Sequence, residues 1–216
     1  MQKSQQLICI CENLTDSLVG IFAAALINHT VVVIRVVIML KTGKIFITLG
    51  SIYILSDLHF ADSDCKLMAP DWIEPEEQIK IINDVVMKND TVYLLGDICF
   101  RIGVDKANEL IASMNGKKYL IKGNHDKKYD ESLFEEVRDF MTISVNGMNI
   151  ALMHYPMLSW PKSHHGSFML HGHIHSDGLY NRNNLEAGIK RYDVGVDANG
   201  YYPVSLNQIE NFLRAL

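Results

Sequence analysis

The chain has 216 residues, of which 48% are hydrophobic and 21% charged, and its formal net charge is −5. This length and balance fit one globular domain with a sizeable core and leave little room for two full domains. The negative charge gives no support to a polyanion-binding surface, so nucleic-acid binding has no basis in overall composition. The four cysteines form no CxxC pair, which favours reduced thiols in a cytoplasmic protein.

Residues 1–42 form an N-terminal hydrophobic extension whose status the sequence leaves open. Leu18–Leu40 is long enough for a membrane-spanning helix, but Arg35 would cost about 2.5–3.5 kcal/mol near the bilayer centre. Three alternatives remain: a membrane anchor that leaves the domain in the cytoplasm, extra elements packed on the domain, or an extension upstream of a natural start at Met39. We favour the third slightly, because the recognisable domain, residues 43–216, begins only near Gly43.

The first part of this domain alternates between strands and helices. Short apolar runs rich in β-branched residues predict buried strands, and apolar residues at helical spacing predict the segments between them as helices. This order predicts a parallel sheet with right-handed crossovers. The expected strands are Ile52–Leu55, Val92–Leu95 and Tyr119–Ile121, and the expected helices are Pro75–Val86 and Asp105–Met114.

The second part has a different pattern. Asn146-Gly147 between two apolar runs, Met141–Val145 and Met148–Met153, is a strong β-hairpin signal. Two further strands are expected at about Phe168–His171 and about Tyr192–Val196. Ser205 followed by Gln208 resembles a capping box that opens a last helix ending at Leu213.

Polar residues follow directly after the expected strands. Asp57 and His59 follow the first strand, Asp97 the second, and Asn124 the third. Sites in open parallel sheets form beyond the carboxyl ends of strands, and neighbouring strands lie only about 4.8 Å apart. Residues far apart in the sequence are therefore expected to converge at one edge. The converging set is Asp57, His59, Asp97, Asn124, His154, His173 and His175.

This set of side chains has the chemistry of a metal centre. Carboxylate, amide and imidazole groups suit Mn²⁺, Fe, Zn²⁺, Co²⁺ or Ni²⁺, and the absence of cysteine from the set argues against a structural zinc site. Seven ligands are too many for one ion, but a bridging carboxylate would let them hold two. Two ions about 3.5–4 Å apart can share a hydroxide and stabilise both oxygens of an in-line phosphoryl displacement.

Taken in order, these motifs resemble the calcineurin-like metallophosphoesterase superfamily, from about Ser51 to the end of the chain. The resemblance implies an α/β fold, a four-layer α/β/β/α sandwich. The C-terminal half is similar to small bacterial and phage phosphoesterases. The motifs that carry the resemblance are Asp57-Leu58-His59, Gly96-Asp97, Gly123-Asn124-His125-Asp126, His154 and Gly172-His173-Ile174-His175.

The resemblance also implies a role for each residue. His125 would lie near the leaving group, Asp126 would orient it, and Arg101 would contact phosphate. Phe100 departs from the pattern, because an acid often stands there, and we expect altered support of the ligands. One metal would be held by Asp57, His59, Asp97 and His175, and the other by Asp97, Asn124, His154 and His173, with Asp97 bridging.

The sequence thus predicts a metal-dependent phosphoesterase with two divalent ions, Mn²⁺ foremost. A hydroxide shared by the ions would attack phosphorus while His125 assists the leaving group. The substrate would be a small phosphoester, and we favour phosphodiesters because no cap domain is visible. Two alternatives stay open: a metal-dependent nuclease, which the acidic composition disfavours, and a non-catalytic metal-binding scaffold, which should have lost ligands.

Several further polar residues near these motifs have no assigned role. His171 is expected in the core or behind the ligands and not as a ligand itself, and Asp193 and Asp197 are expected to support metal-bound histidines. The others are more readily explained as surface or packing residues than as substrate contacts: Tyr155, Trp160, Lys162, His164, His165, Arg182 and Asn183.

Overall fold

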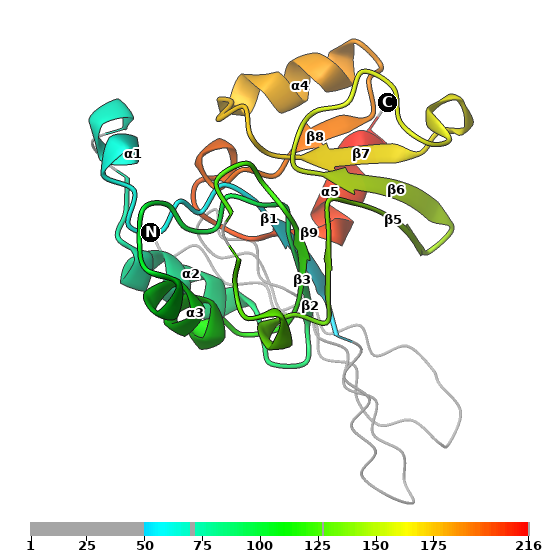
Figure 1. Ribbon diagram of the computed structural model, residues 1–216. Coiled ribbons are helices and arrows are strands. Elements are labelled where there is room, and N and C mark those ends of the chain that lie inside the picture. Colours follow the sequence, from blue (N-terminus) through cyan, green and yellow to red (C-terminus); the bar gives the residue numbers. More distant parts are fainter. Residues whose placement is uncertain (1–49, 70–71, 127, 216) are drawn as a thin grey trace, which may run out of the picture. The chain divides into compact units, whose positions relative to one another are not determined.

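Two β-sheets lie face to face with helices on their outer faces (Figure 1). The computed structural model describes residues 50–69, 72–126 and 128–215. The predicted extension, residues 1–42, and its hydrophobic segment Leu18–Leu40 lie outside this range. Among the described residues, no helix combines the length and apolar character needed to cross a bilayer.

The first sheet has five strands in the order β4-β3-β2-β1-β9. β1, β2, β3 and β4 are parallel neighbours, and β9 pairs with β1 in the antiparallel direction. The three predicted strands of this half are confirmed, whereas β4 and β9 had no sequence signal because they have only three and two residues. The bounds are β1 Ile52–Leu55, β2 Thr91–Leu94, β3 Lys117–Ile121, β4 Glu136–Arg138 and β9 Val204–Ser205.

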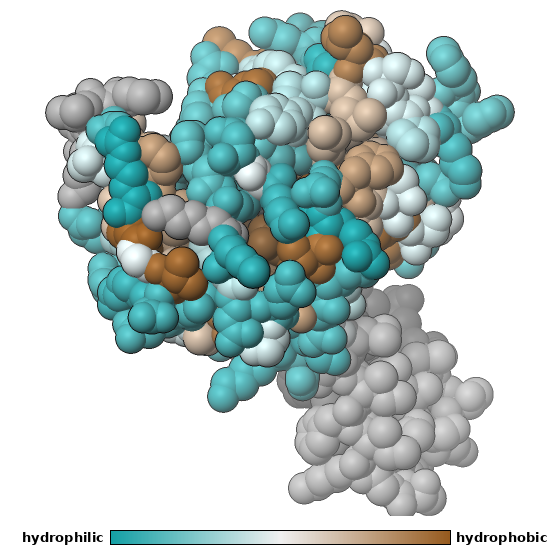
Figure 2. All heavy atoms as spheres, viewed as in Figure 1, coloured by the Kyte–Doolittle hydropathy of each residue, from teal (hydrophilic) through white to brown (hydrophobic). Residues whose placement is uncertain are grey.

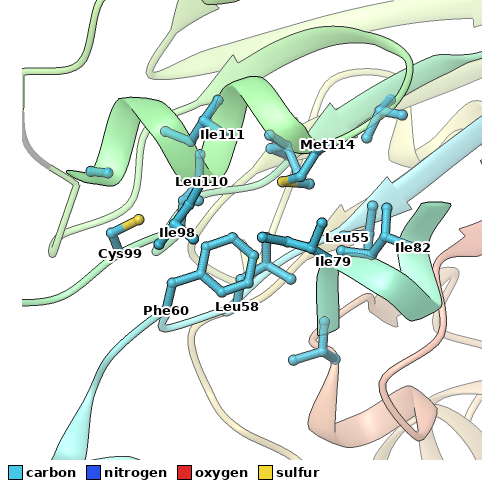
Figure 3. Close-up of a cluster of buried hydrophobic side chains, with 14 of the residues drawn as sticks. Leu55, Leu58, Phe60, Ile79, Ile82, Ile98, Cys99, Leu110, Ile111 and Met114 are labelled. Atoms are coloured by element: carbon cyan, nitrogen blue, oxygen red, sulfur yellow. The ribbon is translucent and has the colours of Figure 1, made fainter. Parts of the chain in front are cut away.

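Helices α2 (Pro75–Val85) and α3 (Val104–Ser113) cover the outer face of this sheet, as predicted. Strand residues alternate between the two faces, so Leu55 packs under the helices while Ile54 faces the second sheet. The outer core includes leucine and isoleucine side chains of β1, α2 and α3 around the ring of Phe60 (Figure 3). A short helix, α1 (Ser63–Met68), precedes α2 and was not predicted.

The second sheet has four strands in the order β5-β6-β7-β8. β5 and β6 form the predicted antiparallel hairpin, and β6, β7 and β8 are parallel. The last strand was predicted to reach Val196, but it ends at Asp193. The chain there crosses to the first sheet, where Gly195 forms a bridge with Ser56. The bounds are β5 Phe140–Val145, β6 Met148–Met153, β7 Phe168–His171 and β8 Arg191–Asp193.

One helix, α4 (Gly178–Glu186), packs against β8 on the second sheet's outer side, and it was not predicted. Its buried residues are Asn181 and Asn184, so it has no apolar stripe for a sequence pattern to reveal. The last helix, α5 (Leu206–Leu213), begins with the predicted capping box. Short 3₁₀ turns lie at Glu131–Leu133, Ser163–His165 and Asp197–Asn199.

These layers confirm the predicted four-layer α/β/β/α sandwich. The inner core lies between the sheets and includes Ile54 and Leu95 from the first and Leu152 and Leu170 from the second. On the face shown in Figure 2, the described residues are mostly hydrophilic, and hydrophobic residues form separate groups. This architecture brings the carboxyl ends of β1, β2 and β3 close to those of β6 and β7.

Candidate metal centre

The predicted ligands gather where strands of the two sheets end. Among the described histidines, cysteines and acids, two groups of three match the two predicted sets, and the ligand atoms within each group lie within 4.8 Å of one another. Each group combines residues that follow β1 or β2 with residues that follow β6 or β7. The groups are Asp57, His59 and His175, and Asp97, His154 and His173.

Asp97 lies between the two groups. Its Oδ2 atom is 3.7 Å from His59 Nε2 and 3.3 Å from His154 Nε2. The amide oxygen Oδ1 of Asn124 lies 3.0 Å from the same nitrogen of His154. Asp97 is therefore placed within reach of both groups, and Asn124 lies on the side of His154.

The ligand residues have an unusual backbone. Non-glycine residues rarely adopt positive φ, and such conformations are concentrated at functional sites because they cost free energy. Five of the seven predicted ligands adopt them, which means that the fold holds these residues in place against local backbone preference. They are Asp57 (59°), His59 (44°), Asp97 (52°), His173 (73°) and His175 (45°).

Glycines next to the ligands allow the loops to approach one another closely. A Cβ atom at Gly96 would collide with the backbone of Gly123, on the neighbouring loop. A Cβ atom at Gly172 would collide with the side chains of Ser56 and Asp57 from the other sheet. The glycine in each motif is therefore needed for convergence of the loops.

Three imidazoles are oriented by acceptors behind them. Nδ1 of His59 lies 3.0 Å from Asp62 Oδ2, and Nδ1 of His175 lies 2.7 Å from Asp197 Oδ2. Nδ1 of His154 donates to the carbonyl oxygen of Leu95 at 2.7 Å. Each ring thus keeps Nε2 available for a metal ion, the arrangement that is usual for metal-binding histidines.

The residues fit a pair of divalent ions. The Nε2 atom of His59 is buried and has no hydrogen-bond partner among the described residues, although buried polar atoms are normally paired. A metal ion between this nitrogen and Asp97 would supply the missing partner. Sequence analysis anticipated Asp197 as a supporting residue but missed Asp62, although an acid three residues after a metal-binding histidine was a usable signal.

The surroundings shift the pKa values of the candidate ligands in different directions. Burial opposes ionisation of Asp97, but hydrogen bonds from His154 and from the backbone N–H of His125 outweigh it and lower its pKa. The hydrogen bond to Asp197 raises the pKa of His175 to about 9. Burial raises the pKa of Asp57 to about 7, although nearby histidines oppose this shift.

These pKa values predict a pH-dependent metal affinity. A metal ion must displace the protons held by His175 up to about pH 9 and by Asp57 up to about pH 7. Apparent affinity for Mn²⁺ is therefore expected to rise from pH 6 and to level off above the pKa of about 9. Titration against a competing chelator at several pH values measures this.

The Asp197→Asn variant provides the comparison. Without the carboxylate, the pKa of His175 should fall, so the rise in affinity should end at a lower pH. Affinity above that pH should drop by roughly 10–100-fold, as is usual for loss of a supporting carboxylate. A pH profile that is identical in both proteins would contradict the assigned contact.

His125 lies at the edge of the centre. Its side chain is 37% exposed, and Nε2 is 4.0 Å from Asp97 Oδ2. Its backbone N–H donates to Asp97 Oδ1 at 2.8 Å. The ring of Phe100 packs edge-on against the imidazole with 4.5 Å between centroids, so Phe100 supports His125 through an apolar contact.

Asp126 supports the loops and is not seen to orient the imidazole of His125. Its Oδ2 accepts hydrogen bonds from the backbone N–H groups of Asp97 and Gly123, and its Oδ1 accepts from Ile98 N–H and the Tyr129 hydroxyl. The carboxylate thereby joins the loops that follow β2 and β3. The structure therefore gives Asp126 a different partner set from the predicted one.

Arg101 lies over the ring of Phe100 and pairs with Asp64. Its guanidinium carbon is 4.6 Å from the Phe100 centroid, and Nη1 is 2.8 Å from Asp64 Oδ2. Its side chain is 63% exposed. In this arrangement the guanidinium is paired with Asp64, so contact with a substrate phosphate stays a prediction.

Tyr155, one of the polar residues without a role assigned from the sequence, packs against two of the predicted ligands. Its ring lies 4.4 Å from that of His173 and 5.1 Å from that of His154, and the residue is 40% exposed. His171 is fully buried, as expected. We expected Asp193 to support a histidine. Its carboxylate instead accepts hydrogen bonds from the Ser176 hydroxyl and the Gly195 N–H, so it supports loops.

Comparisons with known proteins identify relatives that match more than half of this chain. The uncharacterized protein MJ1445 of Methanocaldococcus jannaschii is 32% identical over 173 residues, which cover 77% of this chain and 93% of that protein. The gene 66 protein of Mycobacterium phage D29 is 27% identical over 161 residues, or 59% of this chain and 80% of the phage protein.

A solved structure supports the fold. The protein of unknown function AQ665 from Aquifex aeolicus is 25% identical and superposes with a TM-score of 0.61, covering 75% of this chain and 98% of that one. The family model for calcineurin-like phosphoesterases matches residues 50–193, which hold all seven predicted ligands. The chain belongs to the calcineurin-like phosphoesterase family.

Proposed function

We propose that this protein hydrolyses phosphoesters, with phosphodiesters preferred, using two divalent ions, Mn²⁺ foremost. One observation carries the proposal: the Asp97 carboxylate of one ligand group lies 3.7 Å from His59 Nε2 of the other group, beside the partly exposed imidazole of His125. A scaffold that had lost catalysis would have no need to keep both a bridging carboxylate and an exposed imidazole next to it.

When bound, the ions would activate water as the nucleophile and offset the negative charge of the phosphoryl group. His125 would donate a proton or a hydrogen bond to the leaving oxygen, since its ring is the exposed imidazole next to Asp97. Phe100 would hold that ring in place from the side. Tyr155, whose ring lies next to that of His173, would also contact the substrate.

The decisive test combines metal analysis with activity. The full chain is stripped with a chelator and reconstituted with Mn²⁺, Ni²⁺ or Zn²⁺. Each form is then assayed on bis(p-nitrophenyl) phosphate, p-nitrophenyl phosphate, cyclic nucleotides and single-stranded DNA. We expect about two ions per chain, with faster turnover of the chromogenic diester than of the monoester.

Other results would select other functions. Cleavage confined to DNA would favour the nuclease alternative. Full metal occupancy without turnover of any substrate would favour a metal-binding scaffold. Faster turnover of the monoester would keep the phosphoesterase but reverse the preference for diesters.

A further inference from the structure

A cavity lies at the amino ends of strands β7 and β8, whereas the metal centre lies at their carboxyl ends. It has a volume of about 350 Å³, within the range of small-molecule sites. Gly166 precedes β7, and Lys190 and Arg191 lie at the start of β8, whereas His173 and His175 follow the end of β7. The cavity is lined by Leu158, Trp160, Ser163, His164, Gly166, Gly188, Ile189, Lys190 and Arg191.

The lining is cationic although the whole chain is acidic, with a net charge of −5. It contains lysine, arginine and histidine and no aspartate or glutamate. Within the described part of the chain, the side chains of Lys190 and His164 form no ion pair, and Lys190 Nζ lies 5.7 Å from the centre of the Phe168 ring. These groups are therefore free to bind an anion.

The walls of the cavity are held by hydrogen bonds. Arg191 donates from Nη1 to the Met157 carbonyl at 3.0 Å, and its buried Nε atom has no partner among the described residues. The Trp160 indole N–H donates to the Ser167 carbonyl at 3.2 Å, and the Ser167 hydroxyl donates to the Pro161 carbonyl at 2.7 Å. The loop that carries Trp160 is thus fixed before any ligand arrives.

Apolar groups stand beside the cations. Leu158 is 98% exposed and Ile189 is 37% exposed, and both line the cavity with the indole of Trp160. An exposed leucine next to an indole offers a surface for a flat apolar group. Cations and aromatic surface together match a ligand that has both a phosphate and a planar ring.

We propose that this cavity binds a nucleotide, with the phosphate at Lys190 and His164 and the base against Trp160. The site is separate from the metal centre, because the two lie at opposite ends of the parallel strands β7 and β8. It does not depend on the proposed hydrolysis, so it can be tested in protein that is active or inactive.

The two tryptophans of the chain, Trp72 and Trp160, allow a direct test. Trp72 lies near His59 and His175, so the Trp72→Phe variant leaves Trp160 as the sole indole reporter, away from the metal centre. The metal-loaded variant is titrated with 5′-AMP, adenosine and inorganic phosphate while tryptophan fluorescence is recorded. We expect saturable quenching by 5′-AMP and affinity for adenosine about tenfold weaker, because the charged contact is missing.

Charge reversal supplies the control. In the same background, Lys190→Glu should weaken 5′-AMP binding by at least about tenfold, whereas Lys88→Glu, an exposed lysine after α2, should leave it within about twofold. Calorimetry on the unmodified chain should likewise show tighter binding of 5′-AMP than of adenosine. Equal binding by both charge variants, no saturable response, or a response that disappears with chelation of the metal would each overturn the proposal.

Discussion

Replacement of Asp97 by alanine is expected to remove metal and to lower kcat/KM for a phosphodiester by more than about 10³-fold. Oδ2 of Asp97 lies between His59 Nε2 and His154 Nε2, and its Oδ1 accepts the backbone N–H of His125. Alanine would therefore remove the carboxylate that faces both His59 and His154. Metal content and steady-state rates at equal protein concentration measure both losses.

Asp105 offers a matched control, because it is exposed in the first turn of α3. Asp105→Ala should keep metal content and rate within about twofold, the range of surface substitutions. Circular dichroism of both variants would establish that the fold is kept. Two ions per chain in Asp97→Ala would contradict the bridging position, whatever the rate.

Replacement of His125 by alanine is expected to keep both ions and to lower the rate by roughly 10²–10⁴-fold, the usual loss for a general acid. The imidazole is partly exposed at the edge of the centre, and its Nε2 atom lies 4.0 Å from Asp97 Oδ2. The hydrogen bond of His125 to Asp97 is made by the backbone N–H, which alanine keeps. It would assist departure of the leaving group, so the loss should grow as the leaving group becomes more basic. Rates on aryl methyl phosphates of graded phenol pKa measure this dependence.

His165 serves as the control for this change, because it is exposed in the loop between β6 and β7. His165→Ala should retain full activity on every ester of the series. An unchanged rate of His125→Ala on the ester with the poorest leaving group would exclude a general-acid role. A loss of metal in the same variant would instead mark His125 as a ligand or as essential to the loop.

The elements that could be predicted from the sequence are those whose buried residues are apolar and regularly spaced. β1, β2 and β3 are buried runs, and α2 and α3 have apolar stripes that face the sheet, so burial fixes both kinds of pattern. Helix α4 was not predicted, because its buried contacts are hydrogen bonds of side-chain amides, such as those of Asn181 with the backbone of Asp193. β4 and β9, with three and two residues, contain too few positions to show any alternation.

The candidate ligands could be proposed from the sequence because each of them follows the end of a strand. The supporting contacts were less readable, because some are made by the backbone. The carbonyl group of Leu95, which orients His154, belongs to every residue type and leaves no mark in the sequence. The position of Phe100 against His125 depends on how two loops meet, which only the folded chain determines.

Both candidate ion positions draw ligands from the two sheets. One takes Asp57 from the first sheet and His175 from the second, and the other takes Asp97 and His154 in the same way. Each bound ion would therefore connect the two sheets through coordination bonds, in addition to the apolar core between them. Because metal binding would be linked to folding, the supply of metal around the protein would govern its lifetime as well as its rate.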